Sequence, residues 1–334
     1  MTIYIIRASH ANQYELQNYE PLIKNHDIKL ISSKNPLTST KIPTIKLWSP
    51  TDLPLFPYRK QILNRLIGGE QWLLGLENMV SQRDILHTAE TYTPYTHQAV
   101  MLRKNKRIKK LICTCWETIP HNNEKFNRLK LWKKDSYKYV DIFHTPTQRA
   151  KDALIKEGVN PNKIKVIKYG VDLNRFSARP HAPKSKSVVL TVARKVEEKG
   201  LKIWNRLNAE LGESLDFKWL DTVPYESIAS EYKKADIFLL PSIKTKTWEE
   251  QYGMALVEAM AAGLPIVTTN TGAIPEVTGN TAIHCDPNYA SVKNKLLKLS
   301  SSRALLAKYQ KHTRLRAVEY FDSLKQSRLL SELY

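Results

Sequence analysis

Short apolar runs recur along the chain, and most are separated by stretches long enough to form a helix. Runs rich in Val and Ile that do not alternate with polar residues are typical of strands buried on both faces of a parallel sheet. The pattern therefore predicts a strand at each run. The runs cover 3–6, 28–31, 44–48, 84–88, 111–116, 140–145, 163–167, 187–193, 216–220, 236–240 and 265–269.

The stretches between these runs are typical of helices, most clearly at 153–160, 200–212 and 225–235. Repeated alternation of strand and helix indicates an α/β fold built from doubly wound parallel sheets. Residues 169–186 are rich in polar residues, Pro and Ser, which predicts two α/β halves joined there. The tail, 303–334, is expected to form helices that close the fold.

Length and composition agree with this organisation. At roughly 100–200 residues per domain, 334 residues correspond to two domains. A hydrophobic content of 42% with 25% charged residues is ordinary for a globular protein and excludes a disordered chain. The three cysteines, Cys113, Cys115 and Cys285, are too few for a disulfide framework and favour a reducing compartment. Cys113 and Cys115 make a poor zinc signature, so we interpret them as core residues on a strand.

The charge is unusual, because the net value is +20 and the excess is concentrated in the first half. Residues 1–170 hold 28 basic and 14 acidic residues, whereas 171–334 hold 24 and 18. One interpretation is an anionic partner of the first half, such as a phosphate-bearing lipid, a membrane surface or a nucleic acid. The other is a solvated basic surface that serves solubility.

The sequence shows no membrane-spanning segment. The longest apolar stretch, 254–269, is too short to cross a bilayer and contains Glu258. Residues 1–10 lack a basic leader and are interpreted as a first strand rather than a signal peptide. We therefore expect a cytoplasmic protein, with the cytoplasmic face of a membrane as a candidate location.

The stretch 248–277 carries the most chemical information. Gly253 allows a close backbone approach, and a helix is expected from about 253 to 262, ending at Gly263. The N–H groups of 253–256 would lie at the positive end of that helix, where phosphate binds readily. Glu250 precedes the helix and Glu258 lies in it, so both could accept hydrogen bonds from sugar hydroxyls. Alternatively, Glu250 only complements the helix dipole and Glu258 is a surface residue, which the residues alone favour for Glu258.

A second basic stretch, VARKVEEKG at 192–200, supports a phosphate site. Arg194 ends a predicted buried strand, and Lys199 begins the next helix. In open α/β sheets, ligands bind beyond the carboxyl ends of the strands. An arginine fork and a lysine point charge at that edge suit a diphosphate.

Several stretches, taken in order, resemble the retaining glycosyltransferases of the GT-B fold, family 4, also described as the group 1 type. Two Glu separated by seven residues, Glu250 and Glu258, are this family's best-known motif. The resemblance is convincing over about 140–334 and weaker before that. The matching stretches are KIKVIKYGVDLNRF, VARKVEEKG, YKKADIFLLPS, EQYGMALVEAMAAGLPIV and EYFDSLKQSRLLSELY.

The resemblance implies a GT-B fold, in which two Rossmann-like doubly wound domains face a central cleft. Residues 1–168 would form an acceptor-binding domain and 169–317 a nucleotide-sugar-binding domain. A C-terminal helix at about 318–334 would pack back on the first domain.

The resemblance also implies roles in binding the donor and in catalysis. Glu250 would contact the sugar hydroxyls and Glu258 the ribose, while Arg194 and Lys199 would hold the diphosphate. This family generally works without a bound metal, and no cofactor is expected, because these cationic groups can stabilise the leaving diphosphate. Backbone contacts would come from Gly253, Met254, Ala255 and Leu256, and the base would lie near Thr222 and Tyr225.

The first half departs from the family pattern. Residues 7–22 lack the glycine-rich loop of many relatives, and Trp116-Glu117 stands where many carry a histidine. Glu90 and Glu117, at predicted strand ends, could orient or deprotonate the acceptor hydroxyl. The alternative for each is a salt bridge across the cleft. The histidines nearby, His87, His97 and His121, are interpreted as structural.

Residues 102–138 form a basic cluster with 12 Lys or Arg and 3 acidic residues. A basic amphipathic helix that contains Trp is a membrane-surface signature. The alternative is a helix whose apolar face packs on the sheet while its lysines are solvated. The predicted membrane or acceptor patch comprises Lys125, Arg128, Lys130, Trp132, Lys133 and Lys134.

The leading hypothesis is the transfer of a hexose from a UDP- or GDP-linked donor to a glycan or lipid-linked acceptor. The alternative is a nucleic-acid-binding or DNA-glycosylating GT-B protein, which the +20 charge allows. A nucleotide-sugar epimerase on the same fold is a third candidate, because a fold does not fix a function.

Overall fold

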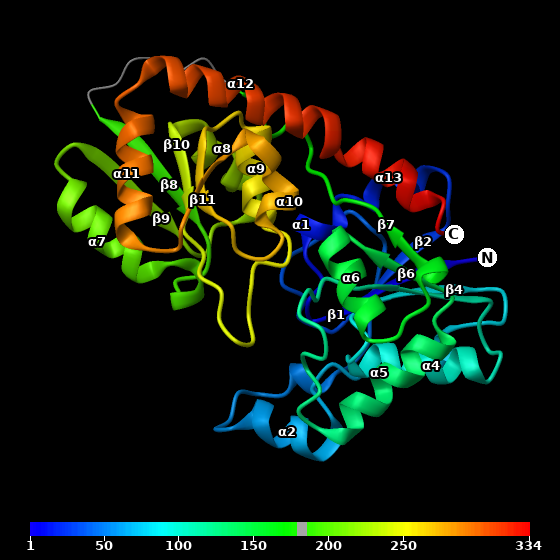
Figure 1. The fold of residues 1–334 in the computed structure, drawn as a ribbon. Helices are drawn as coiled ribbons and strands as arrows, with labels where there is room; N and C mark the ends of the chain where they lie inside the picture. The colour runs from blue at the N-terminus through cyan, green and yellow to red at the C-terminus, as the bar shows by residue number, and fades with distance from the viewer. Residues whose placement is uncertain (179–185) are drawn as a thin grey trace. The chain divides into compact units, whose positions relative to one another are not determined.

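A computed structural model describes residues 1–178 and 186–334 (Figure 1). Part of the predicted seam at 169–186 therefore lies outside the described residues. The chain divides into two compact units. The first unit comprises Met1–Ile167 together with Gln326–Tyr334, and the second unit comprises Lys168–Lys325.

The first unit is built on a seven-stranded parallel sheet with strand order β3-β2-β1-β4-β5-β6-β7. Apart from the edge strands, these strands are buried almost throughout, as their apolar runs predict. An order that runs outward in both directions from β1 is that of a doubly wound sheet. The strands are β1 (Ile3–Ala8), β2 (Ile28–Ser32), β3 (Thr44–Lys46), β4 (Ile85–Ala89), β5 (Lys110–Thr114), β6 (Ile142–Thr145) and β7 (Ile164–Val166).

Helices of the first unit begin at recognisable signals. Thr93 caps α4, where its side chain accepts from the N–H of Thr96 and Pro94 takes the first helical position. Thr147 caps α6 in the same way. The helices are α1 (Gln13–Leu16), α2 (Arg59–Ile67), α3 (Leu76–Met79), α4 (Pro94–Lys104), α5 (Asn127–Tyr139) and α6 (Gln148–Lys156), with 3-10 turns at Glu20–Lys24, Pro50–Asp52 and Pro161–Lys163.

The second unit has a five-stranded parallel sheet with strand order β12-β11-β10-β8-β9. Every predicted apolar run of the chain overlaps a strand, and the structure adds β12, which the sequence pattern missed. The strands are β8 (Ser187–Val192), β9 (Leu215–Leu220), β10 (Ile237–Leu240), β11 (Ile266–Thr269) and β12 (Ile283–Cys285).

The helices after β8 connect these strands and continue into α13, most of which belongs to the first unit. They are α7 (Leu201–Leu211), α8 (Tyr225–Lys234), α9 (Met254–Ala261), α10 (Ile274–Thr278), α11 (Tyr289–Ser300), α12 (Arg303–Tyr320) and α13 (Ser323–Ser331), with 3-10 turns at Glu197–Lys199 and Gly279–Thr281. No helix in the described parts of the chain is long and apolar enough to cross a bilayer.

The closing helix expected at about 318–334 is divided between two helices in the structure. Helix α12 ends at Tyr320, and α13 begins at Ser323 after a short break. Only residues from Gln326 onward belong to the first unit. There the hydroxyl of Tyr334 lies 2.7 Å from His87 Nδ1, and Lys110 Nζ donates to the carbonyl of Leu333 at 2.6 Å.

Candidate active site

In the second unit, the predicted site residues follow the carboxyl ends of the parallel strands. Arg194 follows β8 and is exposed, and Thr222 follows β9 and is exposed as well. The N–H of Lys195 donates to Asp221 Oδ2 at 3.3 Å, which ties these two loops together. Gly200 fits here because a Cβ at this position would lie 2.1 Å from the carbonyl oxygen of Pro241.

Helix α9 begins as the sequence predicts. Gly253 has φ +81°, a left-handed conformation that favours glycine, and serves as the N-cap. The N–H of Leu256 donates to the carbonyl of Gly253 at 2.8 Å. Leu256 therefore uses its amide within the helix, so we correct the expected set of backbone donors. The amides that this helix end can offer to a ligand are those of Gly253, Met254 and Ala255.

Glu250 is buried before α9 and is held by two polar side chains. Its Oε2 accepts from Lys199 Nζ at 2.6 Å and from Ser242 Oγ at 3.3 Å. The ammonium of Lys199 also lies 4.8 Å from the centre of the Trp248 ring. Lys199 thus neutralises Glu250 directly, and any contact with a diphosphate would be shared with this ion pair.

The backbone around Glu250 is fixed by a glycine that the sequence analysis did not single out. Gly272 follows β11 with φ +60°, and a Cβ there would lie 2.1 Å from the carbonyl oxygen of Glu250. The N–H of Ala273 donates to the same carbonyl at 2.7 Å. The neighbouring Glu249 is buried and pairs instead with Lys244 at 2.9 Å. Of the two adjacent glutamates, Glu250 is the one held beside Lys199.

Glu258 is buried inside α9, so its interpretation as a surface residue is wrong. Its side chain is only 2% exposed, and Tyr232 Oη donates to Oε2 at 2.7 Å. The second oxygen, Oε1, is buried and has no hydrogen-bond partner among the described residues. Burial raises the pKa of this carboxyl to about 7. The site therefore holds a buried acceptor that lacks a donor.

Arg175 lies close to this carboxyl, although sequence reasoning assigned it no role. Its guanidinium carbon lies 3.6 Å from the centre of the Tyr225 ring, and its charge lowers the pKa of Glu258. The Nη2 atom of Arg175 is buried without a hydrogen-bond partner in the described part of the chain. Arg175 lies in the stretch KIKVIKYGVDLNRF, which resembles the family. That resemblance could therefore have indicated Arg175 as a candidate site residue.

In the first unit, Glu90 follows β4 in an unusual conformation. Its φ is +61°, a strained value for a residue other than glycine. Its N–H donates to the carbonyl of Thr114, and its Oε1 accepts from the N–H of Trp116, both at 2.8 Å. The pKa of Glu90 is raised to about 8, mainly by burial; the Trp116 N–H lowers it, and the charge of Glu117 raises it.

Glu117 is held differently, because four amide groups donate to its carboxylate. The N–H groups of Thr118 and Ile119 donate to Oε1 at 3.0 and 2.9 Å, and the side chains of Asn122 and Asn123 donate to Oε2 at 2.9 and 3.0 Å. These bonds fix the position of the carboxylate. Among the described residues of the first unit, the partners of the Glu117 carboxylate are thus amide groups, and not the cation of a salt bridge.

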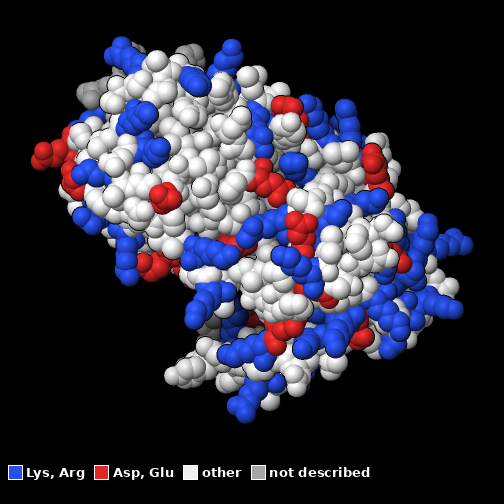
Figure 2. Space-filling model, viewed as in Figure 1, with Lys and Arg blue, Asp and Glu red and all other residues white. Residues whose placement is uncertain are grey.

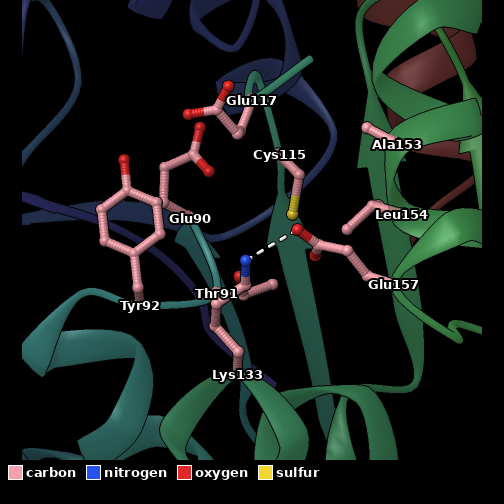
Figure 3. A pocket seen from close by; sticks show the side chains of 9 residues that line it. All are labelled: Glu90, Thr91, Tyr92, Cys115, Glu117, Lys133, Ala153, Leu154 and Glu157. Carbon is pink, nitrogen blue, oxygen red and sulfur yellow. Dashed lines mark hydrogen bonds and ion pairs between the residues drawn. The ribbon is translucent and has the colours of Figure 1, made fainter. Parts of the chain in front are cut away.

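A small pocket of about 10 Å³ lies beside these two carboxylates (Figure 3). That volume has room for about one water molecule, so it is too small for a sugar. The figure shows Lys133 and Glu157 joined on the other side of the pocket. Its lining residues are Glu90, Thr91, Tyr92, Cys115, Glu117, Lys133, Ala153, Leu154 and Glu157.

Lys133 is buried, which corrects its place in the predicted membrane patch. Its Nζ pairs with Glu157 at 2.7 Å and Glu124 at 3.1 Å, and it donates to the carbonyl of Asn122 at 3.0 Å. His121, Glu124 and Glu157 have the spacing of metal ligands. The ammonium of Lys133 pairs with both glutamates, so a cation already occupies the space between them.

Trp132 is also buried, so it is a second correction to the patch. Its ring stacks on His97 at 4.5 Å between ring centres and meets Trp72 edge to face. The other members, Lys125, Arg128, Lys130 and Lys134, are exposed. Figure 2 shows many Lys and Arg side chains on this face of the first unit.

His87 is one of the histidines interpreted from the sequence as structural. His87 is buried between Tyr334 and Thr114, with a distance of 2.8 Å from Nε2 to Thr114 Oγ1. Burial lowers the pKa of His87 well below its usual range. The Cys113 and Cys115 thiols are free and buried in the core of this unit.

Two family sequence models match the chain. The model described as glycosyl transferases group 1 matches residues 205–316, and the model described as glycosyltransferase family 4 matches residues 22–175. The chain belongs to the group 1, family 4 glycosyltransferases. The resemblance on which the site residues were selected is therefore confirmed.

Curated relatives of this family 4 chain match part of its length. The amylovoran biosynthesis glycosyltransferase AmsK of Erwinia amylovora is 31% identical over 157 residues, which cover 37% of the chain and 38% of AmsK. The MMP alpha-(1->4)-mannosyltransferase of Mycolicibacterium hassiacum is 24% identical over 49% of the chain and 45% of that protein. The chain thus matches less than half the length of these relatives.

Solved structures match the whole family 4 chain. The Anabaena protein HepE, crystallised with UDP and glucose, has a TM-score of 0.77 at 15% identity, covering 100% of the chain and 99% of HepE. Sucrose-phosphate synthase from Thermosynechococcus elongatus has a TM-score of 0.76 at 15% identity, with 100% and 98% covered. The predicted GT-B fold with two Rossmann-like domains is confirmed.

Proposed function

We propose that this family 4 chain transfers a hexose from a UDP- or GDP-linked donor, with retention of configuration. The observation that carries the proposal is Glu258, whose buried Oε1 needs a hydrogen-bond donor. A ribose hydroxyl would supply one, and the stacked pair of Arg175 and Tyr225 would lie on the side of the base. HepE was crystallised with UDP and with UDP-glucose, which supports this class of donor.

The sugar and diphosphate would occupy the region between Glu250 and the start of α9. Glu250 is fixed by Lys199 and Ser242, so its carboxylate is available to sugar hydroxyls in a defined position. Arg194, Lys199 and the first amides of α9 would stabilise the negative charge that develops on the leaving diphosphate. Because cationic side chains supply this stabilisation, we propose that transfer needs neither a metal nor another cofactor.

The first unit would bind the acceptor. Glu117 is held in place by four donors, whereas Glu90 keeps one carboxylate oxygen outside its bond to Trp116. We therefore assign contact with the acceptor hydroxyl to Glu90, whose pKa is raised mainly by burial and in smaller part by the charge of Glu117. A pKa of about 8 is near the range in which a carboxylate can exchange a proton at neutral pH.

The proposed acceptor is a glycan or a lipid-linked sugar, and the proposed location is the cytoplasmic face of a membrane. The name of AmsK refers to the biosynthesis of a polysaccharide, amylovoran, which supports a glycan acceptor.

A panel of nucleotide sugars tests the donor class by thermal unfolding. UDP- and GDP-hexoses are added with EDTA present, and nucleosides serve as controls. A ligand at 100 times its Kd should stabilise the protein by about 2.7 kcal/mol. At least one diphosphate donor should raise Tm while its nucleoside has a much smaller effect. If every donor leaves Tm unchanged, or stabilisation requires added Mg²⁺, the proposal is wrong in its donor class or its metal independence.

A further inference from the structure

A second pocket of the first unit shares no lining residue with the pocket beside Glu90, and none of the roles proposed above uses it. We call it the α4 pocket, because residues of α4 form one of its walls. Its volume is about 250 Å³, just below the ~300–1,000 Å³ of sites for drug-sized ligands. The α4 pocket therefore has room for one small ligand.

One wall of the α4 pocket is a face of helix α4. His97, Met101 and Asn105 all line the pocket, and their spacing of four residues brings them onto the same face of a helix. They extend from the first turn of α4 to its C-cap, over about 12 Å at the rise of an α-helix. Glu90 lies shortly before the start of α4, so the pocket runs along the helix away from Glu90.

Trp72 supplies the aromatic part of the pocket and is held on several sides. Its indole N–H donates to a backbone carbonyl at 3.0 Å. Its ring meets the rings of His97 and Trp132 edge to face, at 6.0 and 5.7 Å between centres. Next to it, Gln98 exchanges two hydrogen bonds with the backbone of Leu73, at 3.0 and 2.9 Å. The indole is thus fixed before a ligand binds, which reduces the entropy lost on binding.

Several polar groups of the wall lack partners. Among the described residues, the side chains of Glu77 and Asn105 have neither a hydrogen bond nor an ion pair, and the buried Nδ1 of His97 has no partner. Burial lowers the pKa of His97, so its neutral ring offers one donor and one acceptor at pH 7. The guanidinium of Arg107 is positioned by a bond from Nη2 to the carbonyl of Glu77 at 2.8 Å.

We propose that the α4 pocket binds one pyranose residue of a glycan. A sugar ring has C–H faces that pack on an aromatic ring, here Trp72, and a rim of hydroxyls that both donate and accept. In the wall, Glu77 accepts, Arg107 donates, and the amide of Asn105 does both. Because charges of both signs line the pocket, a neutral ligand with many hydroxyls fits it better than an anion or a cation.

The bound sugar would belong to the acceptor and differ from the residue that reacts at Glu90. This part of the proposal rests on the proposed function, because only a glycan acceptor has further sugars to bind. An acceptor long enough to reach both places would bind more tightly than a monosaccharide. Sugar binding itself is independent of the transfer reaction, since it is measured without a donor and without turnover.

Methionine methyl groups provide local probes that test the proposal by NMR. Of the five methionines, Met101 lines the α4 pocket, whereas Met254 lies at the start of α9 in the proposed donor site. The methyl glycosides of glucose, mannose, galactose and N-acetylglucosamine are titrated into the full chain with isotopically labelled methionine methyls. At least one should shift the Met101 signal to saturation, with a Kd of about 1–10 mM for so small a ligand. UDP alone should shift Met254 and leave Met101 in place.

A variant that removes two of the unpaired groups tests the wall directly. Glu77→Ala with Asn105→Ala changes two exposed positions and should raise the Kd for the sugar at least about tenfold. The matched control, Asn208→Ala with Glu213→Ala, removes the same two groups from exposed positions in the second unit. The control should bind the sugar like the wild type. Circular dichroism confirms that both variants are folded.

Three results would overturn the proposal. They are no shift of Met101 with any glycoside, equal affinity of the test and control variants, and sugar shifts confined to Met254, which would place the sugar in the donor site. The proposed function fails separately, if UDP and the nucleotide sugars leave Met254 unshifted. The two failures are therefore read from different signals.

Discussion

The carboxyl of Glu258 is buried but only half satisfied by the protein. Tyr232 donates to Oε2, while Oε1 has no partner among the described residues. An unpaired buried acceptor costs about 1–3 kcal/mol, so a ligand hydroxyl that donates to Oε1 recovers that free energy. Because the ligand-free protein leaves Oε1 unpaired, relief of this cost on binding would contribute part of the proposed affinity for ribose.

Nucleoside diphosphate affinity should increase as pH rises through about 7, because that is the pKa to which burial raises Glu258. Below this pH the carboxyl is mostly protonated, and above it the anion accepts the ribose hydroxyl more strongly. Glu258→Gln should weaken binding by about tenfold or more at pH 8 and remove this pH dependence. Calorimetric titration from pH 5.5 to 8.5 measures both. An unchanged slope in Glu258→Gln would exclude the ribose contact.

Arg175 should contribute to nucleotide affinity through its stack on Tyr225 and its charge near Glu258. Arg175→Ala is expected to weaken nucleoside diphosphate binding by about tenfold, which corresponds to about 1.4 kcal/mol. The matched control is Arg206→Ala, which removes a similar stack on Tyr289, 3.8 Å from the ring centre, outside the proposed site. Equal losses in the two variants, measured by the same titration, would show that Arg175 has no special role.

At the scale of elements, the sequence predicted the strands well because fully buried parallel strands consist of continuous apolar runs. Strand β12, with the short sequence Ile-His-Cys, has no such run and was missed. The start of α9 was predictable because Gly253 and the helix pattern are local signals. The burial of Lys133 was not predictable, because its partner Glu157 lies 24 residues away, directly after the next helix. Neither periodicity nor composition records such a pairing.

The ion pairs of Lys133 should stabilise the contact between α5 and α6. Lys133→Ala leaves Glu157 buried without a cation, and removing one partner of a buried pair costs about 3–5 kcal/mol. The adjacent Lys134 is exposed, so Lys134→Ala should change the free energy of unfolding by less than about 0.5 kcal/mol. Urea unfolding compares the two. Equal stability of both variants would mean that the buried pair does not stabilise the fold.

For the molecule as a whole, the two units carry different parts of the proposed function. The second unit holds the residues assigned to the donor, and the first holds Glu90, Glu117 and the α4 pocket. The excess of 28 basic over 14 acidic residues in 1–170 accordingly lies in the half assigned to the acceptor and the membrane. Sequence could indicate this charge imbalance but not the α4 pocket, because Trp72 and Arg107 line one pocket only in the folded unit.

Sugar transfer itself is the most direct test of the account. The wild type, Glu250→Gln and the exposed control Glu213→Ala are incubated with the best-binding donor and with glycan or lipid-linked acceptors, in EDTA. The account predicts nucleoside diphosphate release and a product whose anomeric configuration, read by NMR, matches the donor. Glu250→Gln should be slower by about 100-fold or more, while Glu213→Ala keeps the wild-type rate. An inverted product, or a Glu250→Gln variant as fast as the wild type, would contradict it.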